Sequence, residues 1–321
     1  MKKILVIFGG KSNEHDVSIS STKSISKNID KNLFKVDYIY IDKKGIWKKV
    51  KDPNNLNNYK KVKNYNIITK YDKIFPLIHG EFGEDGKIQG LFEIYNVNYV
   101  GSNTKTSAIA MDKVITKELV EQLGIPVVDY LYINKNNYDI EKLKKQITKK
   151  IKYPCFIKPA NAGSSFGAQK VENPKLLEEK LNETFKYDNK VLVEKLLDKR
   201  EIEVAILGNE NRIISEPGEI IIDKNLYDYE TKYNDINTKI QLANLTKKEK
   251  ETIKKYAITI YEKLECKDLA RIDFFIENET NKIYFNEINT MPGFTKLSMY
   301  PFLIEQKNIT YKELITKLME D

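Results

Sequence analysis

The first hundred residues alternate short apolar runs with helical patterns, and this alternation limits the fold more than any other feature of the chain. Residues 3–8 are apolar and end at Gly9-Gly10, which leads into a predicted helix near Asp16. Further apolar runs follow at 38–41 and 74–79. Strands that alternate with helices favour a parallel sheet covered on both faces. The sequence therefore predicts an α/β domain at its N-terminal end, with 49–66 as a surface loop.

The rest of the chain mixes helices with paired strands. Helices are expected over 111–123, where Gly124 and Pro126 end the helix, and over 140–151. A third follows the capping box Thr246-Lys-Lys-Glu249. The further expected strands are 155–159, 191–196, 201–207 and 212–215, with 270–276 and 282–286 as an antiparallel hairpin. This pattern predicts three domains, at 1–101, 102–197 and 198–321.

The net charge of +8 raises the question of a nucleic-acid partner. Only three of the 54 basic residues are arginine, the residue favoured for reading bases, and the lysines are spread along the whole chain. No nucleic-acid partner is therefore expected. The apolar runs are too short to span a membrane. Cys155 and Cys266 match no metal or redox spacing, which favours reduced thiols and a cytoplasmic location.

The hairpin carries the strongest group of candidate ligands, Arg271-Ile-Asp273 with Asn286-Glu-Ile-Asn289. Symmetric pairing would place residue 273 opposite 285 and residue 271 opposite 287. Asp273, Glu287 and Asn289 would then share one face, because side chains alternate along a strand. Two carboxylates and an amide oxygen suit Mg²⁺ when phosphates supply further ligands. The alternative is a solvated polar face, but an arginine inside an apolar strand favours a site.

A second candidate is the loop from Lys158 to Gly167, with Gly163-Ser164-Ser165 at its centre. Backbone N–H groups and hydroxyls of such a loop can hold phosphate oxygens while the lysine supplies positive charge. It is not a Walker loop, because the lysine precedes the glycines. Taken alone, the segment favours a flexible connector over a phosphate site.

Both histidines follow predicted strands, His15 after the first and His79 after the run at 74–79. Open α/β sheets bind ligands at the carboxyl ends of their strands. Each histidine alone would suit a structural role, but their shared placement favours a functional one. The Gly-x-Gly-x-x-Gly pattern is absent, which argues against a nicotinamide enzyme.

With these residues assembled, the chain resembles the D-alanine–D-alanine ligase family of the ATP-grasp superfamily, over essentially its whole length. The matching motifs, in chain order, are Phe8-Gly-Gly-Lys-Ser with Glu14-His15, His79-Gly with Gly83 through Gly90, Met111-Asp-Lys113 with Gly124-Ile-Pro126, Lys158-Pro through Gly167, Val193-Glu194-Lys195, Tyr227-Asp-Tyr229 with Lys232-Tyr233, Arg271-Ile-Asp273, and Asn286 through Thr295 with Ser298.

The resemblance implies an ATP-grasp fold, in which a Rossmann-like parallel-sheet domain precedes two α+β domains that clamp ATP. It implies ATP-dependent ligation of two D-alanine molecules through an acyl phosphate, for peptidoglycan precursor synthesis. ATP and two Mg²⁺ ions, with Mn²⁺ as a substitute, would be required. A homodimer is expected.

The resemblance also implies site residues. Catalytic roles would fall to Glu14, Ser164, Tyr233, Arg271 and Gly293, and substrate binding to Val17, His79, Ser298 and Met299. ATP would be held by Lys113, Lys158, Ser165, Glu194, Lys195, Leu197, Glu201 and Lys232, and the metal ions by Asp273, Glu287 and Asn289. The polar segment 223–235 would be a lid that excludes water from the acyl phosphate.

Two alternatives stay open. Ligases of the same superfamily place D-lactate or D-serine second, although Tyr233 and its tyrosine-rich surroundings favour D-alanine. A nucleotide-binding regulator could keep the fold without the reaction, but it could then discard Glu14 and the metal ligands, which are present.

Overall fold

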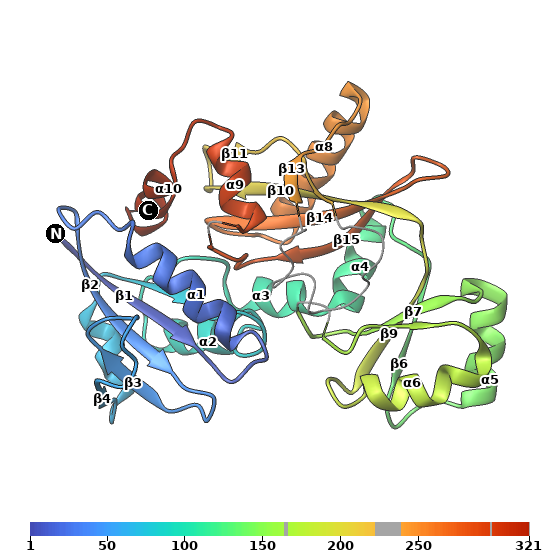
Figure 1. Ribbon diagram of the computed structural model, residues 1–321, viewed down its shortest axis with the longest axis horizontal. Coiled ribbons are helices and arrows are strands. Elements are labelled where there is room, and N and C mark those ends of the chain that lie inside the picture. Colours follow the sequence, from blue (N-terminus) through green and yellow to red (C-terminus); the bar gives the residue numbers. More distant parts are fainter. Residues whose placement is uncertain (164–165, 222–238, 296, 321) are drawn as a thin grey trace.

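The computed structural model describes residues 1–163, 166–221, 239–295 and 297–320, which are arranged around three β-sheets (Figure 1). The first sheet is built from residues near the N-terminus, the second from the middle of the chain, and the third from its last third. The order of sheets along the chain follows the three predicted domains, whose boundaries remain a prediction.

The N-terminal sheet has the strand order β4-β3-β2-β1-β5. One side of it is parallel, since β1 (Lys2–Gly9) pairs in parallel with β2 (Phe34–Ile41) and with the edge strand β5 (Lys73–Leu77). The strands β3 (Trp47–Val50) and β4 (Tyr59–Lys61) extend the other side in antiparallel fashion. The predicted parallel sheet is confirmed for β2, β1 and β5.

The predicted surface loop at 49–66 is wrong in part, because β4 and the end of β3 lie inside it. Trp47 and Val50 are buried while Lys48 and Lys49 between them stay partly exposed. A strand of four residues with only its two ends buried is too short to stand out in a lysine- and asparagine-rich segment. The strand β3 forms because it pairs with β2, and the local sequence alone does not reveal this pairing.

The two faces of β1 enter two different cores. Ile4, Val6 and Phe8 lie in one core, and Leu5 and Ile7 lie in the other. The first core includes side chains of α1 (His15–Ser26) and of the C-terminal helices α9 (Met299–Glu305) and α10 (Tyr311–Glu320). The second includes α2 (Lys87–Ile94). The C-terminal end of the chain therefore helps cover the N-terminal sheet (Figure 1).

The predicted helix at 111–123 corresponds to α4 (Lys113–Gln122), and a separate helix, α3 (Thr104–Met111), precedes it. Asp112 separates them and caps α4 by accepting hydrogen bonds from the backbone N–H groups of Val114 and Ile115. Gly124, with a φ of +73°, follows the end of α4. The helix end was predicted correctly, whereas α3 was not foreseen.

The central sheet has the order β6-β9-β7-β8 and is antiparallel throughout. Its strands are β6 (Tyr130–Asn134), β7 (Cys155–Pro159), β8 (Gln169–Val171) and β9 (Lys190–Lys195). Its helices are α5 (Ile140–Gln146), continued by a π-helical turn at Ile147–Ile151, and α6 (Leu177–Thr184), preceded by a 3₁₀ turn at Pro174–Leu176.

The C-terminal sheet has the order β13-β12-β10-β14-β15, with β11 paired to β10. Its strands are β10 (Lys199–Leu207), β11 (Ile213–Ile214), β12 (Gly218–Ile221), β13 (Lys239–Leu242), β14 (Leu269–Glu277) and β15 (Ile283–Asn289). Helix α8 (Lys247–Lys263) packs on this sheet and begins at the predicted capping box of Thr246 and Glu249.

The predicted pairing of the β14–β15 hairpin is wrong by two residues at the site. Asp273 lies opposite Glu287, and Arg271 lies opposite Asn289. The register shifts next to Asp273, because β15 contains one extra residue between Phe285 and Glu287. A shift of two residues preserves the face on which a side chain lies. The prediction that Asp273, Glu287 and Asn289 share a face is therefore confirmed.

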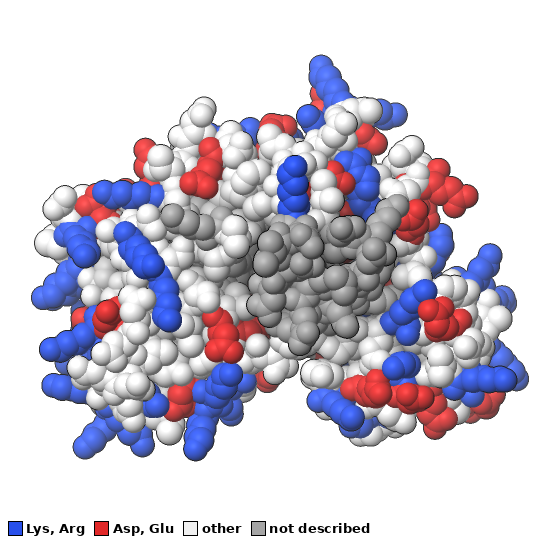
Figure 2. All heavy atoms as spheres, in the orientation of Figure 1, with Lys and Arg blue, Asp and Glu red and all other residues white. Residues whose placement is uncertain are grey.

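The surface charge is mixed on the face shown in Figure 2, where lysine and arginine side chains are spread among aspartate and glutamate side chains. In the described part of the chain, no helix is both long and apolar enough to cross a membrane.

Candidate active site

A loop of the central sheet contacts candidate residues from other parts of the chain. Lys113, at the start of α4, donates a hydrogen bond from Nζ to the carbonyl oxygen of Ala162 at 2.7 Å. The next residue, Gly163, lies against Glu14 from the N-terminal sheet. Lys113 also forms an ion pair with Glu287 of β15, at 3.2 Å. One short loop thus joins candidate residues from three parts of the chain.

Glu14 is buried, with 7% of its surface exposed, and its carboxylate lies between two glycines. A Cβ atom would lie 2.4 Å from Glu14 Oε2 if added at Gly80 and 2.5 Å if added at Gly163. Only glycine lets the backbone approach the carboxylate this closely. The carboxylate is therefore held in a narrow polar site between the first two sheets.

His79 joins the N-terminal sheet to the loop after β15. Its Nδ1 lies 3.0 Å from the carbonyl oxygen of Met291, and its Nε2 lies 3.1 Å from Ser21 Oγ. Burial lowers the pKa of His79 to about 4, so the ring is neutral near pH 7. His15 has a different environment, with Nδ1 2.6 Å from the carbonyl oxygen of Gly10 and Nε2 3.1 Å from Tyr40 Oη.

Glu84 belongs to the same region, although the sequence analysis did not select it. Its Oε2 accepts a hydrogen bond from the Gly80 N–H at 2.7 Å, so Glu84 and Glu14 contact the same glycine backbone. Burial raises the pKa of Glu84 to about 8, and the nearby Glu14 charge adds to the shift. The signal in the sequence was its place in the motif after His79, five residues along the chain.

Arg271 is held by two carboxylates on the face of the C-terminal sheet. It donates to both oxygens of Asp273, at 2.8 and 2.7 Å, and its Nε lies 2.7 Å from Glu203 Oε2. Asn289 donates to Asp273 Oδ2 at 3.0 Å. Burial alone would lower the pKa of Arg271, but Asp273 and Glu203 raise it well above its usual value. Arg271 is therefore a fixed positive charge.

The three side chains predicted to bind metal ions lie close together on the C-terminal sheet. Asp273 and Glu287 are cross-strand partners, and Asn289 contacts Asp273. Asp273 forms an ion pair with Arg271, and Glu287 forms one with Lys113. This face of the sheet therefore carries carboxylates that can attract metal ions beside cations that can attract anionic ligands. No three His, Cys, Asp or Glu side chains of the described residues form a possible metal site. Hence Mg²⁺ here would need Asn289 and phosphate oxygens as further ligands.

Glu194 is the centre of a buried ion-pair cluster in the central sheet. Its Oε2 lies 2.7 Å from Lys158 Nζ, and its Oε1 lies 2.8 Å from Lys117 Nζ. Lys158 also donates to Asn286 Oδ1 at 3.3 Å, which links the cluster to β15. Burial alone would raise the pKa of Glu194, but the two lysines lower it to about 2. Lys117 is a further residue that the sequence analysis did not select.

The other residues predicted to bind the nucleotide lie beside Glu194 along the chain. Leu197 is buried in a small apolar cluster with Phe275. Lys195 is exposed and forms an ion pair with Glu277 at 3.1 Å. Glu201 lies opposite Phe275 in the β10–β14 ladder and 3.5 Å from Lys199 Nζ.

Gly293 and Ser298 lie together in the loop that follows β15. A Cβ atom added at Gly293 would lie 2.9 Å from Ser298 Oγ, and Ser298 Oγ accepts a hydrogen bond from the Thr295 N–H at 3.0 Å. Met299 is buried in the core shared with the N-terminal sheet, so its side chain faces that core. Val17 is half-buried on α1. Ser164, Ser165, Lys232 and Tyr233, with the predicted lid at 223–235, lie outside the described residues.

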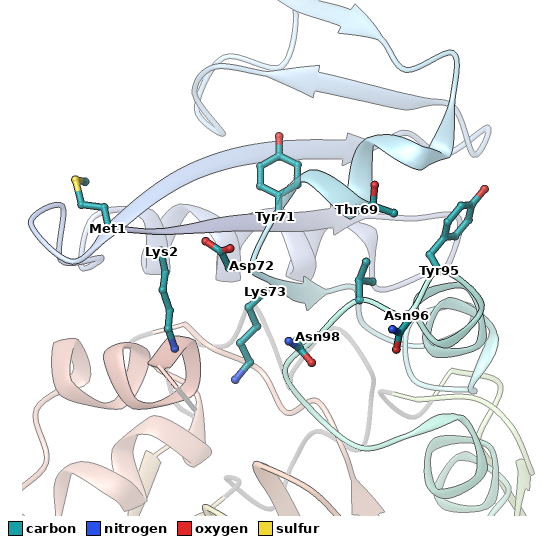
Figure 3. A pocket seen from close by; sticks show the side chains of 10 residues that line it. Met1, Lys2, Thr69, Tyr71, Asp72, Lys73, Tyr95, Asn96 and Asn98 are labelled. Atoms are coloured by element: carbon teal, nitrogen blue, oxygen red, sulfur yellow. The ribbon is translucent and has the colours of Figure 1, made fainter.

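A separate hollow of about 670 Å³ lies at the other end of the N-terminal sheet (Figure 3). Lys2, Asp72 and Lys73 line it, at the amino ends of β1 and β5, together with Tyr95 and Asn96. Ligands of open α/β sheets bind at the carboxyl ends of the strands, where Glu14 and His79 lie. This hollow is therefore not the candidate active site.

Comparison with known proteins agrees with this geometry. The models of the D-ala D-ala ligase N-terminus and C-terminus match residues 3–102 and 119–320. The chain belongs to the D-alanine–D-alanine ligase family. A D-alanine–D-alanine ligase of Acetivibrio thermocellus is 41% identical, over 99% of this chain and 95% of that protein. D-alanine–D-alanine ligase B of Clostridium tetani is 44% identical, over 99% and 92%.

Solved structures of the family share the whole architecture. The VanG D-Ala:D-Ser ligase from Enterococcus faecalis has a TM-score of 0.87 and 33% identity, covering 99% of this chain and 98% of that chain. The D-alanine–D-alanine ligase from Coxiella burnetii has a TM-score of 0.85 and 31% identity, covering 99% and 93%. D-alanine–D-alanine ligases are ATP-dependent and have the ATP-grasp fold, so the predicted fold class is confirmed.

Proposed function

We propose that the protein joins two D-alanine molecules into D-alanyl-D-alanine, with ATP converted to ADP and phosphate, as a step in making peptidoglycan precursors. The proposal is supported by the family and by curated relatives that carry this name. One observation about this chain supports it further. The loop at 160–163 contacts both Lys113 and Glu14, so the lysine proposed to bind phosphate and the carboxylate proposed to bind the ammonium group lie on either side of one loop.

The first step needs a carboxylate and a phosphate held together. Glu14, between Gly80 and Gly163, is suited to bind the ammonium group of the first D-alanine. Lys113 and Lys158 are suited to bind ATP phosphates. The substrate carboxylate then attacks the γ-phosphorus, a C–O–P linkage forms, and the bond to the β-phosphate breaks as ADP leaves. Positioning of this kind supplies much of the rate enhancement in phosphoryl transfer.

The second step joins the two amino acids. The amine of the second D-alanine, after loss of its proton, attacks the acyl carbonyl and forms a C–N bond, and the C–O bond to phosphate then breaks. Negative charge develops on the carbonyl oxygen between these events. Arg271, fixed by Asp273 and Glu203, and the Gly293 N–H are the proposed donors to that oxygen. Ser298, next to Gly293, is the proposed partner of the second carboxylate.

Mg²⁺ is part of the proposal, with Asp273, Glu287 and Asn289 as its protein ligands and Mn²⁺ as a substitute. Bound there, it would neutralise phosphate charge. We further propose that Glu194, Leu197 and Glu201 bind the nucleoside, and that Ser164, Ser165, Lys232, Tyr233 and the 223–235 segment complete the site.

The decisive experiment measures phosphate release from ATP and Mg²⁺ with D-alanine alone, and with D-alanine plus D-serine or D-lactate, and determines product masses. We expect D-alanine-dependent release and the D-Ala–D-Ala dipeptide. If D-alanine and D-serine together give mainly the mixed dipeptide, the activity is instead that of a D-Ala:D-Ser ligase, like VanG. No release with any D-amino acid would contradict the proposed function.

We also propose a cytoplasmic homodimer, because the substrate ATP is supplied there and the family resemblance implies a dimer. Light scattering coupled to size-exclusion chromatography tests the dimer, and a mass near that of one 37.4 kDa chain would contradict it.

A further inference from the structure

Lys117 is a buried charge to which the proposed reaction gives no role. It lies on α4 one turn after Lys113, and none of its surface is exposed. Its Nζ lies 2.8 Å from Glu194 Oε1 and 6.0 Å from the centre of the Tyr130 ring. Burying an ammonium group costs several kcal/mol, and a buried ion pair rarely repays this cost in stability. Its presence therefore calls for a functional explanation.

The geometry of Glu194 supplies that explanation. Its two oxygens are held by different lysines, Oε1 by Lys117 and Oε2 by Lys158. Lys158 keeps 11% of its side-chain surface exposed and also contacts Asn286, next to the proposed metal ligands, so its ammonium group lies at the edge of the cluster nearest the proposed phosphate site. Lys117 has no exposed surface, so its ammonium group is the more enclosed of the two. It is therefore the partner that stays on Glu194 when a nucleotide engages Lys158.

An ionised carboxylate accepts hydrogen bonds and cannot donate them. Opposite the edge of a purine, it favours the 6-amino group of adenine and repels the 6-carbonyl oxygen of guanine or hypoxanthine. This discrimination requires that the carboxylate stay ionised and keep one orientation. A second, permanently bound cation provides both conditions.

We propose that Lys117 is a positioning residue that fixes the Glu194 carboxylate and thereby selects 6-aminopurine over 6-oxopurine nucleotides. The inference rests on the proposed function in assigning Glu194 to the adenine base. It adds a residue that touches neither substrate nor metal and acts through Glu194 alone.

The test compares ATP with ITP, in which a carbonyl oxygen replaces the 6-amino group. In Lys117→Met, we expect kcat/KM for ATP to fall about tenfold through KM, while the value for ITP changes less than about threefold. The ATP-to-ITP preference therefore falls by at least about threefold. Glu118→Gln, on the exposed side of the same helix, is the matched control and keeps the wild-type preference.

A double-mutant cycle separates positioning from a general structural role. Glu194→Gln should lose the ATP preference, and adding Lys117→Met to it should lower the preference no further. Equal losses for ATP and ITP in Lys117→Met, or a wild-type enzyme that does not distinguish them, would overturn the inference. If Lys117→Met does not fold, Lys117→Gln replaces it, and an unchanged ATP preference in that variant overturns the inference equally.

Failure of the proposed function is distinguishable from failure of this inference. If the wild type releases no phosphate with D-alanine, the function fails. Calorimetric binding of ATP and ITP then still tests Lys117, because nucleotide selection does not require the amino-acid substrate.

Discussion

Asp273 and Glu287 are direct cross-strand partners, and the extra residue in β15 produces this pairing. In the register that holds at the tip of the hairpin, where Phe274 lies opposite Phe285, Glu287 would lie opposite the buried Ile272. The bulge turns Glu287 to the polar face and leaves Asn286 beside Lys158. One inserted residue thus brings the second carboxylate to the proposed metal site.

Glu287→Gln should raise the Mg²⁺ concentration needed for half-maximal rate by about tenfold or more, because it removes one of two ionised ligands. Steady-state rates over a Mg²⁺ titration measure this. Glu279→Gln, exposed at the tip of the same hairpin, is the control and should keep the wild-type requirement. An unchanged Mg²⁺ requirement in Glu287→Gln would remove this residue from the metal site.

Gly163→Ala should raise the KM for D-alanine and lower kcat/KM about 100-fold. The new Cβ would meet Glu14 Oε2 at 2.5 Å, and the flexible glutamate can move away, so the protein folds but its carboxylate is displaced. Gly90→Ala in α2 is the control, since its Cβ meets nothing nearer than 3.6 Å. That variant should keep full activity and gain up to about 1 kcal/mol of stability. Full activity in Gly163→Ala would show that Glu14 does not need this position.

Arg271→Lys should lower kcat by about 100-fold to 1,000-fold, because lysine keeps the charge but loses the forked hydrogen bonds to Asp273. Arg200 makes a similar two-bond pair with Glu219, at 2.7 Å for each bond, and Arg200→Lys is the matched control. We expect the control to retain its rate within about twofold. Equal effects of the two substitutions on single-turnover rates would argue against a catalytic Arg271.

Glu84→Gln should change the pH dependence of stability. The pKa of Glu84 is raised to about 8 in the folded protein, above its value in an unfolded chain. At pH values between these two pKa values, the folded protein keeps a proton on Glu84 that the unfolded chain has lost. The free energy of unfolding therefore falls as the pH rises. Relative to Glu84→Gln, the wild type should therefore lose at least about 1 kcal/mol between about pH 5 and about pH 8.5.

Denaturant unfolding at several pH values measures this difference, and Glu81→Gln, exposed in the same loop, is the control. Parallel pH profiles for the wild type and Glu84→Gln would contradict the raised pKa. A wild type that gains stability relative to Glu84→Gln with rising pH would contradict its direction.

Local signals in the sequence were reliable where neighbours along the chain decide the structure. The capping box of Thr246 and Glu249 begins α8, and Gly124 follows the end of α4. The apolar run at 3–8 became β1, an inner strand of the N-terminal sheet whose two faces are buried in two cores. The motifs around Glu14, His79 and Arg271 were found because sites that bind charged groups need particular residues at short spacing.

Lys117 and Glu84 were missed for a shared reason. In sequence each is an ordinary charged residue, and charged residues are usually exposed. Lys117 did carry a signal, since it falls on the same face of α4 as the buried Val114 and Val120. Their burial depends on Glu194 and Gly80, which belong to other parts of the chain.

The sequence by itself determined the α/β class, most strands and helices, and the residues with chemistry suited to phosphate, ammonium and metal. These follow from apolar periodicity and from side-chain chemistry, which act over a few residues. Only the tertiary structure decided the bulge that pairs Asp273 with Glu287, the contact of Gly163 with Glu14, and the enclosure of Lys117. Those features arise from packing between segments far apart in the chain, and such packing leaves no periodic trace in either segment alone.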